Sequence, residues 1–129
     1  LITGTCLSGA KQAKAEALQA LPKVEVLQLP AVNGKLPVAL LLQELAGRNL
    51  TSILLEGGST VHGDFLEAGL VDRIYAFIAP KLIGGKEALT PVGGKGFALM
   101  EDCYVLKETE TLPLGADILL TGRVERNKC

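Results

Sequence analysis

The chain has 129 residues, of which 48% are hydrophobic and 21% are charged, and its formal net charge is −1. This length fits one domain with a hydrophobic core, and no apolar run approaches the roughly 18 residues that span a bilayer. There is no basic excess and only 4% of the residues are aromatic, so the composition argues against a nucleic-acid-binding protein.

The cysteines and the histidine are few and scattered. Cys6, Cys103 and Cys129 show no C-x-x-C spacing, and His62 is the single histidine. An odd, dispersed set of thiols is poor evidence for a disulfide framework or a zinc site and is typical of a reducing compartment. The start of the chain also lacks the charged region and cleavage site of a signal peptide. We therefore expect a cytoplasmic protein with no metal site.

The first half of the chain alternates predicted strands and helices. In chain order these are a strand at Leu1–Thr3, a helix at Ala10–Leu21, a strand at Val24–Leu29, a helix that begins at Pro37 and has Gly47 as its C′ residue, a strand at Ile53–Glu56 and a helix at Ser59–Ala68. Strands separated by helices of this length predict right-handed βαβ crossovers and a parallel sheet. The continuous apolar run Ile53–Leu55 agrees, because parallel strands are covered on both faces.

The second half has a different pattern. Val71–Ala79 carries apolar residues on both faces, which is typical of a central strand, and Pro80–Gly96 is a glycine-rich irregular connection. Phe97–Thr111 and Ala116–Val124 flank a turn at Leu112–Gly115 and predict two antiparallel strands. The fold class is therefore α/β, with parallel βαβ units followed by an antiparallel C-terminal hairpin in one mixed sheet.

The junction at Glu56-Gly57-Gly58 is the main candidate for a functional site. A strand that ends in two glycines and enters a helix brings free backbone N–H groups to the positive end of the helix dipole, where a phosphate binds well. Glu56 lies at the carboxyl end of this strand, where open α/β sheets place their ligands. Two alternatives remain open, because the glycines could simply relieve crowding in a tight turn and Glu56 could be a solvated strand end.

The residues after the glycines offer further polar groups. Ser59 and Thr60 are suited to cap the helix or to donate hydroxyl hydrogen bonds to a phosphate. His62 lies close enough to approach such a phosphate, although a lone histidine in a helix is more often a packing residue, and Asp64 is expected to face solvent. The run is not G-x-G-x-x-G, and no Ser/His/Asp or Cys/His constellation is present. If the protein is an enzyme, a bound cofactor supplies the chemistry.

The stretch Ser52–Gly85 resembles the reductase domain of the bifunctional riboflavin-biosynthesis deaminase/reductase. The strings Glu-Gly-Gly, Phe-Leu-x-Ala-Gly-Leu-Val-Asp and Ala-Pro-Lys-Leu-Ile-Gly-Gly carry the resemblance, which extends over nearly the whole chain. It implies a dihydrofolate-reductase-like fold and NADPH-dependent reduction of 5-amino-6-(5-phosphoribosylamino)uracil to the ribitylamino product. It implies that Glu56 contacts the substrate and assigns no catalytic residue. The residues that it implies for NADPH binding are Gly57, Gly58, Ser59, Thr60, Val61, His62, Gly63 and Asp64.

The chain departs from this family in two residues and in extent. Ser59 stands where the family commonly has proline, and His62 where it has a small residue. The family's reductase domain extends upstream of Leu1, so we expect residues 1–129 to be the C-terminal portion of a single reductase domain, without the deaminase domain. We expect this portion to be inactive alone and to associate with another copy. The alternatives are a related pterin or pyrimidine reductase and a non-catalytic binding or assembly module.

Overall fold

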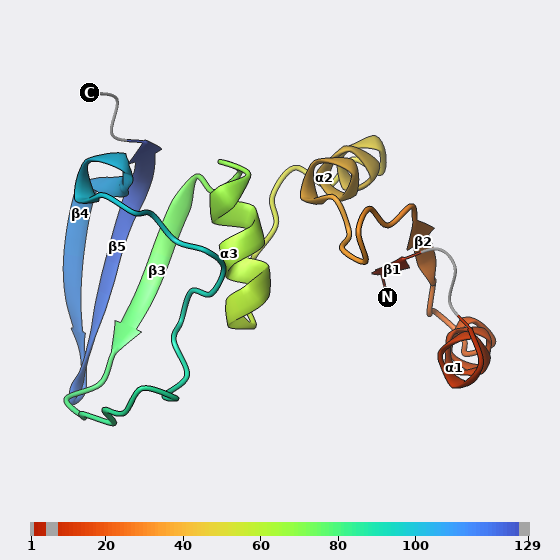
Figure 1. The fold of residues 1–129 in the computed structure, drawn as a ribbon, viewed down its shortest axis with the longest axis horizontal. Helices are drawn as coiled ribbons and strands as arrows, with labels where there is room; N and C mark the ends of the chain where they lie inside the picture. The colour runs from red at the N-terminus through yellow and green to blue at the C-terminus, as the bar shows by residue number, and fades with distance from the viewer. Residues whose placement is uncertain (1, 5–7, 127–129) are drawn as a thin grey trace. The chain divides into compact units, whose positions relative to one another are not determined.

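The computed structural model of the protein describes residues 2–4 and 8–126. The chain divides into two compact units, Leu1–Ile53 and Leu54–Cys129 (Figure 1). Cys6 and Cys129 lie outside the described residues, and Cys103 is a half-buried free thiol. No helix in the described ranges is both long and apolar enough to cross a membrane.

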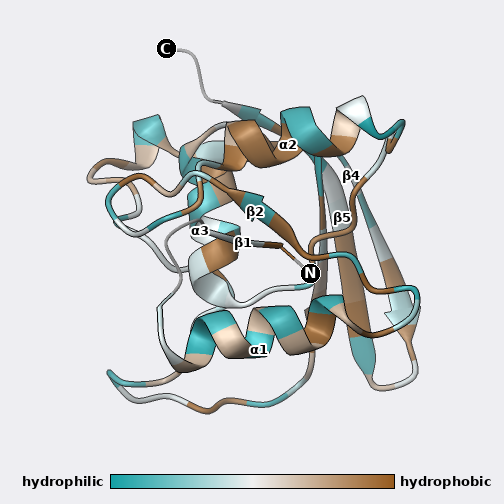
Figure 2. Ribbon diagram, turned by 90° about the vertical axis from the view of Figure 1, so that its right-hand side faces the viewer, coloured by the Kyte–Doolittle hydropathy of each residue, from teal (hydrophilic) through white to brown (hydrophobic). Residues whose placement is uncertain are grey.

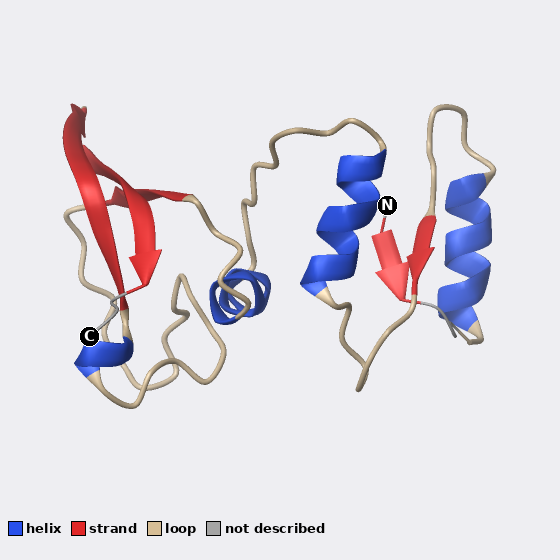
Figure 3. Ribbon diagram, turned by 90° about the horizontal axis from the view of Figure 1, so that it is seen from above, coloured by secondary structure: helices blue, strands red, loops and turns tan. Residues whose placement is uncertain are grey.

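The first unit is built on a βαβ crossover. It contains β1 (Ile2–Gly4), α1 (Ala10–Gln19), β2 (Leu27–Leu29) and α2 (Val38–Gly47). The two strands pair in parallel, with Ile2 opposite Leu27 and Gly4 opposite Leu29 (Figure 3). The predicted parallel unit is therefore confirmed, although both strands are short. Figure 2 shows the difference between the helices: hydrophilic residues recur along α1, whereas α2 is more hydrophobic.

The end of α2 differs from the prediction. Gly47 is the last helical residue, and the left-handed residue that follows the helix is Asn49, with φ 61°. The N–H of Asn49 donates to the Ala46 carbonyl at 2.9 Å, and the N–H of Leu50 donates to the Leu45 carbonyl at 3.2 Å. This is a Schellman motif, and asparagine tolerates its left-handed position better than most residues because its short side chain bonds locally. Assigning Gly47 as the C′ residue was wrong.

The strand predicted at Ile53–Glu56 is absent from the described structure. Residues 51–58 have no regular secondary structure, and the boundary between the two units falls between Ile53 and Leu54. Leu54 is 75% exposed, so this segment is not buried on both faces as a central parallel strand would be. An apolar run becomes a strand only when another strand supplies its hydrogen bonds, and none of the described residues does so here. The expected single mixed sheet consequently appears as two separate sheets.

The second unit is a helix beside a three-stranded antiparallel sheet (Figure 1). Its elements are α3 (Ser59–Glu67), β3 (Arg73–Ile78), a 3₁₀ turn η1 (Met100–Asp102), β4 (Tyr104–Leu114) and β5 (Asp117–Arg126). The predicted C-terminal hairpin is confirmed, with Gly115 at φ 64° in its turn, but its bounds were wrong: the first strand begins at Tyr104 and continues to Leu114, through most of the predicted turn. The strand order is β3-β5-β4. The central strand of this sheet is therefore β5, and the expectation that Val71–Ala79 forms a central strand was wrong, because β3 pairs with β5 alone among the described strands.

The helix α3 is anchored on the sheet by aromatic residues. Phe65 is 5% exposed, and the hydroxyl of Tyr104, at the start of β4, donates to the carbonyl of Leu66 at 2.9 Å. The ring of Phe97 meets Tyr104 edge-on, with 5.5 Å between the ring centres. At its far end α3 closes with Gly69 at φ 68°, in agreement with the predicted helix end. These contacts fix the helix whose first turn forms the candidate site.

Candidate functional site

The turn Glu56-Gly57-Gly58 leads directly into α3. Gly57 has φ 123°, a region that favours glycine, and Gly58 is the extended N-cap residue with φ −66° and ψ 178°. The peptide bond between the two glycines is cis. Glu56 is exposed just before this turn. The predicted site residues 56–64 therefore form one continuous feature, consisting of a carboxylate, a glycine turn and the first two turns of a helix.

The start of α3 is suited to an anion. In the described structure no side chain caps the helix at Gly58, and the sequence Ser59-Thr60-Val61 carries no acidic residue. The first N–H groups of a helix have no partner within the helix and lie at the positive end of its dipole. A Cβ atom built on Gly58 would meet nothing within 4 Å, so the space beside this residue is open. A phosphate group fits this environment.

His62 lies in the middle of this feature but makes protein contacts with both ring nitrogens. Its Nδ1 is 2.8 Å from the carbonyl oxygen of Pro91, and its Nε2 is 3.3 Å from the carbonyl oxygen of Leu55. The side chain is half-buried. The expected contact between His62 and a phosphate stays a prediction, and the structure adds a bridge between two backbone segments that the sequence did not indicate.

A glycine-containing loop runs along α3. The N–H of Gly93 donates to the Ser59 carbonyl at 2.8 Å, and the N–H of Lys95 donates to the Glu67 carboxylate at 2.8 Å. Gly63 is buried against this loop, because a Cβ atom there would lie 2.7 Å from the carbonyl carbon of Gly93. The Gly93-Gly94 pair was read from sequence only as part of an irregular connection. A glycine within the predicted helix together with this Gly-Gly pair is the signal that could have suggested a close approach of two backbones.

The other candidate positions contribute less to the geometry. Thr60 and Val61 are exposed, whereas Ser59 and Asp64 are half-buried. Asp64 was expected to face solvent, and the structure shows that its side chain is partly covered. In the described ranges no group of three or more His, Cys, Asp or Glu residues could hold a metal ion.

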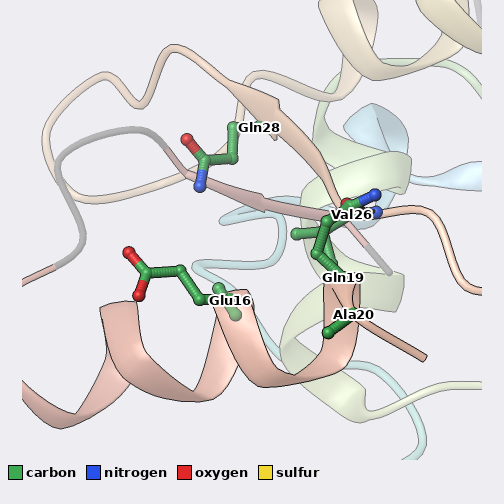
Figure 4. A pocket seen from close by; sticks show the side chains of 6 residues that line it. Glu16, Gln19, Ala20, Val26 and Gln28 are labelled. Carbon is green, nitrogen blue, oxygen red and sulfur yellow. Dashed lines mark hydrogen bonds between the residues drawn. The ribbon is translucent and has the colours of Figure 1, made fainter.

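A separate hollow lies within the first unit, between α1 and β2 (Figure 4). It is a shallow groove of about 350 Å³. The side chain of Gln19 at its edge accepts a hydrogen bond from the N–H of Val26 at 2.6 Å. None of the predicted site residues lines this groove. Its lining residues are Ala15, Glu16, Gln19, Ala20, Val26 and Gln28.

The fold and the glycine turn define an α/β domain with a helix end suited to a phosphate-bearing ligand. Residues 4–120 match the model of the RibD C-terminal domain family, and the chain belongs to this family. The match confirms the resemblance to the riboflavin-biosynthesis reductase domain and the dihydrofolate-reductase-like fold class.

Several known proteins are similar to the chain. The riboflavin biosynthesis protein RibD of Actinobacillus pleuropneumoniae is 44% identical over 97 residues, covering 75% of this chain and 26% of that protein. The 2,5-diamino-6-ribosylamino-4(3H)-pyrimidinone 5′-phosphate reductase of Methanothermobacter thermautotrophicus is 37% identical over 95 residues, covering 74% of this chain and 44% of that protein. The chain thus spans less than half the length of these relatives.

Two solved structures support the same relationship. Acinetobacter baumannii RibD matches with a TM-score of 0.65 and 29% identity, over 78% of this chain and 27% of that chain. A pyrimidine reductase-like protein from Corynebacterium diphtheriae matches with a TM-score of 0.67 and 27% identity, over 97% of this chain and 49% of that chain.

Proposed function

We propose that the chain is part of a reductase of riboflavin biosynthesis that acts on a ribosylaminopyrimidine 5′-phosphate with NADPH. The observation that carries this proposal is the uncapped start of α3 behind Gly57-Gly58, with open space beside Gly58 and Glu56 next to it. Membership of the RibD C-terminal domain family supports the reaction class. The proposed reaction is the reduction of 5-amino-6-(5-phosphoribosylamino)uracil to its ribitylamino product.

The chain's own residues bind and orient in this proposal. When bound, NADPH supplies the hydride that reduces the sugar carbon and opens the ring. Gly57 and Gly58 let the backbone approach the ligand, and the N–H groups of Ser59, Thr60 and Val61 bind a phosphate at the helix start. The Glu56 carboxylate accepts hydrogen bonds from hydroxyl or amine groups of the substrate. His62, Gly63 and Asp64 complete the proposed cofactor segment.

A second substrate has specific support. The relative from Methanothermobacter thermautotrophicus is named for reduction of 2,5-diamino-6-ribosylamino-4(3H)-pyrimidinone 5′-phosphate. The two substrates differ in the pyrimidine ring and share the phosphoribosylamino group, so the same Glu56 turn serves either. Assaying both substrates with the full-length protein that contains this chain decides between them. We propose that this chain alone turns over neither, and NADPH-dependent reduction by residues 1–129 would contradict that expectation.

Calorimetric titration with NADPH tests the cofactor site. The chain is expected to bind NADPH, and Gly58→Val is expected to weaken binding about tenfold or more, because a side chain fills the open space beside the helix start. The matched control is Gly47→Val, where a Cβ atom also meets nothing within 4 Å but the residue lies at the end of α2. Binding that is unaffected by Gly58→Val would contradict the assigned site. Absence of NADPH binding both by this chain and by the full-length protein that contains it favours a non-catalytic module with the same fold.

We further propose that the protein works in the cytoplasm as a homo-oligomer. The scattered, odd number of cysteines supports the cytoplasmic location, because it suits a reducing compartment. The exposed apolar side chains on the sheet of the second unit, Tyr75, Phe77 and Leu112 among them, support self-association.

A further inference from the structure

The two carbonyl groups that face His62 belong to segments far apart in the sequence. Leu55 directly precedes the Glu56-Gly57-Gly58 turn, and Pro91 lies in the long connection between β3 and η1. The ring of His62, near the start of α3, is within hydrogen-bond distance of both. The side chain of His62 therefore links the proposed ligand-binding turn to a loop whose Pro91 lies 29 residues after His62.

The chemistry of these contacts determines what the ring can do. Carbonyl oxygens only accept hydrogen bonds, and a neutral imidazole has one N–H group, whereas an imidazolium has two. The Nδ1 contact with Pro91 is 2.8 Å and the Nε2 contact with Leu55 is 3.3 Å. A neutral ring with its proton on Nδ1 therefore satisfies the shorter contact, and the charged ring satisfies both.

The loop that His62 holds is also fixed to α3 further along. Gly93, two residues after Pro91, donates its N–H to the Ser59 carbonyl, and its backbone packs against Gly63. The contacts of His62, Ser59 and Gly63 together fix the course of this loop past the first two turns of α3. The loop thereby lies next to the residues proposed to bind the cofactor phosphate.

We propose that His62 is a positioning residue: it braces the Glu56-Gly57-Gly58 turn against the loop at Pro91 and so sets the affinity of the cofactor site. This inference rests on the proposed function, because the affinity is that for NADPH. It assigns the effect of His62 to its two backbone partners, Leu55 and Pro91. A direct contact between the ring and a phosphate is the alternative that the experiment must separate.

Three substitutions of His62 test its proposed positioning role. His62→Leu keeps a side chain of moderate size and removes both ring nitrogens, so the Kd for NADPH is expected to rise about tenfold, equivalent to one or two net hydrogen bonds. His62→Asn places an amide donor near the position of Nδ1 and is expected to restore most of the affinity through Pro91. His62→Gln places its amide near the position of Nε2 and is expected to restore less, because the contact with Leu55 is the longer one.

A measurement without NADPH tests the positioning role of His62 independently of the proposed function. Hydrogen exchange of the Gly93 N–H is expected to accelerate about tenfold in His62→Leu and to stay near the wild-type rate in His62→Asn. Gln43→Leu, an exposed change on α2, is the matched control and is expected to alter neither exchange nor affinity. If neither the wild-type chain nor the full-length protein that contains it binds NADPH, the proposed function fails, while the exchange rates still show whether His62 holds the loop.

Two results would overturn the proposal. Unchanged Gly93 exchange in His62→Leu would show that the ring does not hold the loop. A loss of affinity that His62→Asn fails to restore, and that shrinks as salt is raised, would assign His62 to direct electrostatic contact with a phosphate.

Discussion

The backbone at Gly63 lies closer to the carbonyl group of Gly93 than a side chain at position 63 would allow. Gly63 lies within α3, where glycine is otherwise unfavourable by about 0.5–1 kcal/mol relative to alanine. Its use here is explained by the Gly93 carbonyl group, which occupies the space that a Cβ atom would need. The residue proposed from sequence as part of a cofactor segment thus also has a clear packing role.

Gly63→Ala is therefore expected to destabilise the second unit by about 1–3 kcal/mol, because the loop backbone at Gly93 has to move. Both tyrosines of the chain, Tyr75 and Tyr104, lie in the second unit, so tyrosine fluorescence during urea unfolding follows this unit. Gly47→Ala at the end of α2 is the control, since its Cβ atom meets nothing within 4 Å. An unchanged unfolding midpoint for Gly63→Ala would mean that the close approach does not exist in solution.

The individual residues of the site were predictable from sequence to different degrees. Gly57 was placed in a tight turn because its neighbours end one apolar run and begin a helical pattern, and its φ of 123° agrees with that reading. The partners of His62 were not predictable, because they depend on where a loop 29 residues away folds back. Local pattern shows which residues can turn, whereas side-chain partners depend on long-range packing.

Among the secondary-structure elements, the helices were predicted better than the strands. The positions of α1, α2 and α3 follow from helical spacing and from residues that suit helix ends, both of which are local. The predicted strand at Ile53–Glu56 failed because a strand needs partner hydrogen bonds that its own residues cannot provide. The position of β3 at one side of its sheet likewise depends on which strand β5 pairs with. The local sequence of β3 does not determine that pairing.

An ion pair joins the end of α2 to the segment before β2. Arg48, the C-cap residue, lies 2.7 Å from the Glu25 carboxylate and 2.9 Å from the Glu44 carboxylate. The hydrogen bond from Arg48, reinforced by its charge, lowers the pKa of the Glu25 carboxyl. All three groups are at the surface, so the pair is expected to contribute little and to weaken in high salt.

The sign of the pH effect follows from that lowered pKa. The stabilisation by Glu25 is fully present above the ordinary pKa of a glutamate, near 4.5, and is lost as the pH falls through the lowered folded-state value. The melting temperature of Glu25→Gln, followed by circular dichroism at low ionic strength, is expected to lie below that of the wild type at pH 7. The two melting temperatures should converge in acid. A difference that persists at pH 2 would contradict this origin.

Self-association is a property of the whole molecule that the sheet of the second unit makes testable. In the register of the sheet, Phe77 lies opposite Leu119 and Leu119 lies opposite Leu112, so these three share one face. Phe77 is 69% exposed, and β3 and β4 form the outer strands of the described sheet. Exposed apolar faces and open strand edges favour contact with another chain.

We therefore expect light scattering at tens of micromolar to give a mass that is a multiple of the chain mass. Phe77→Lys is expected to shift the population toward the monomer, because it places a charge on the shared apolar face at the outer strand β3. Leu82→Lys is the matched control, since Leu82 is also highly exposed but lies in the loop after β3. If both variants reduce the mass equally, general hydrophobicity drives the association. A monomeric wild-type chain would contradict the expected self-association. A selective effect of Phe77→Lys would locate the contact on the sheet face that Phe77 shares with Leu119 and Leu112.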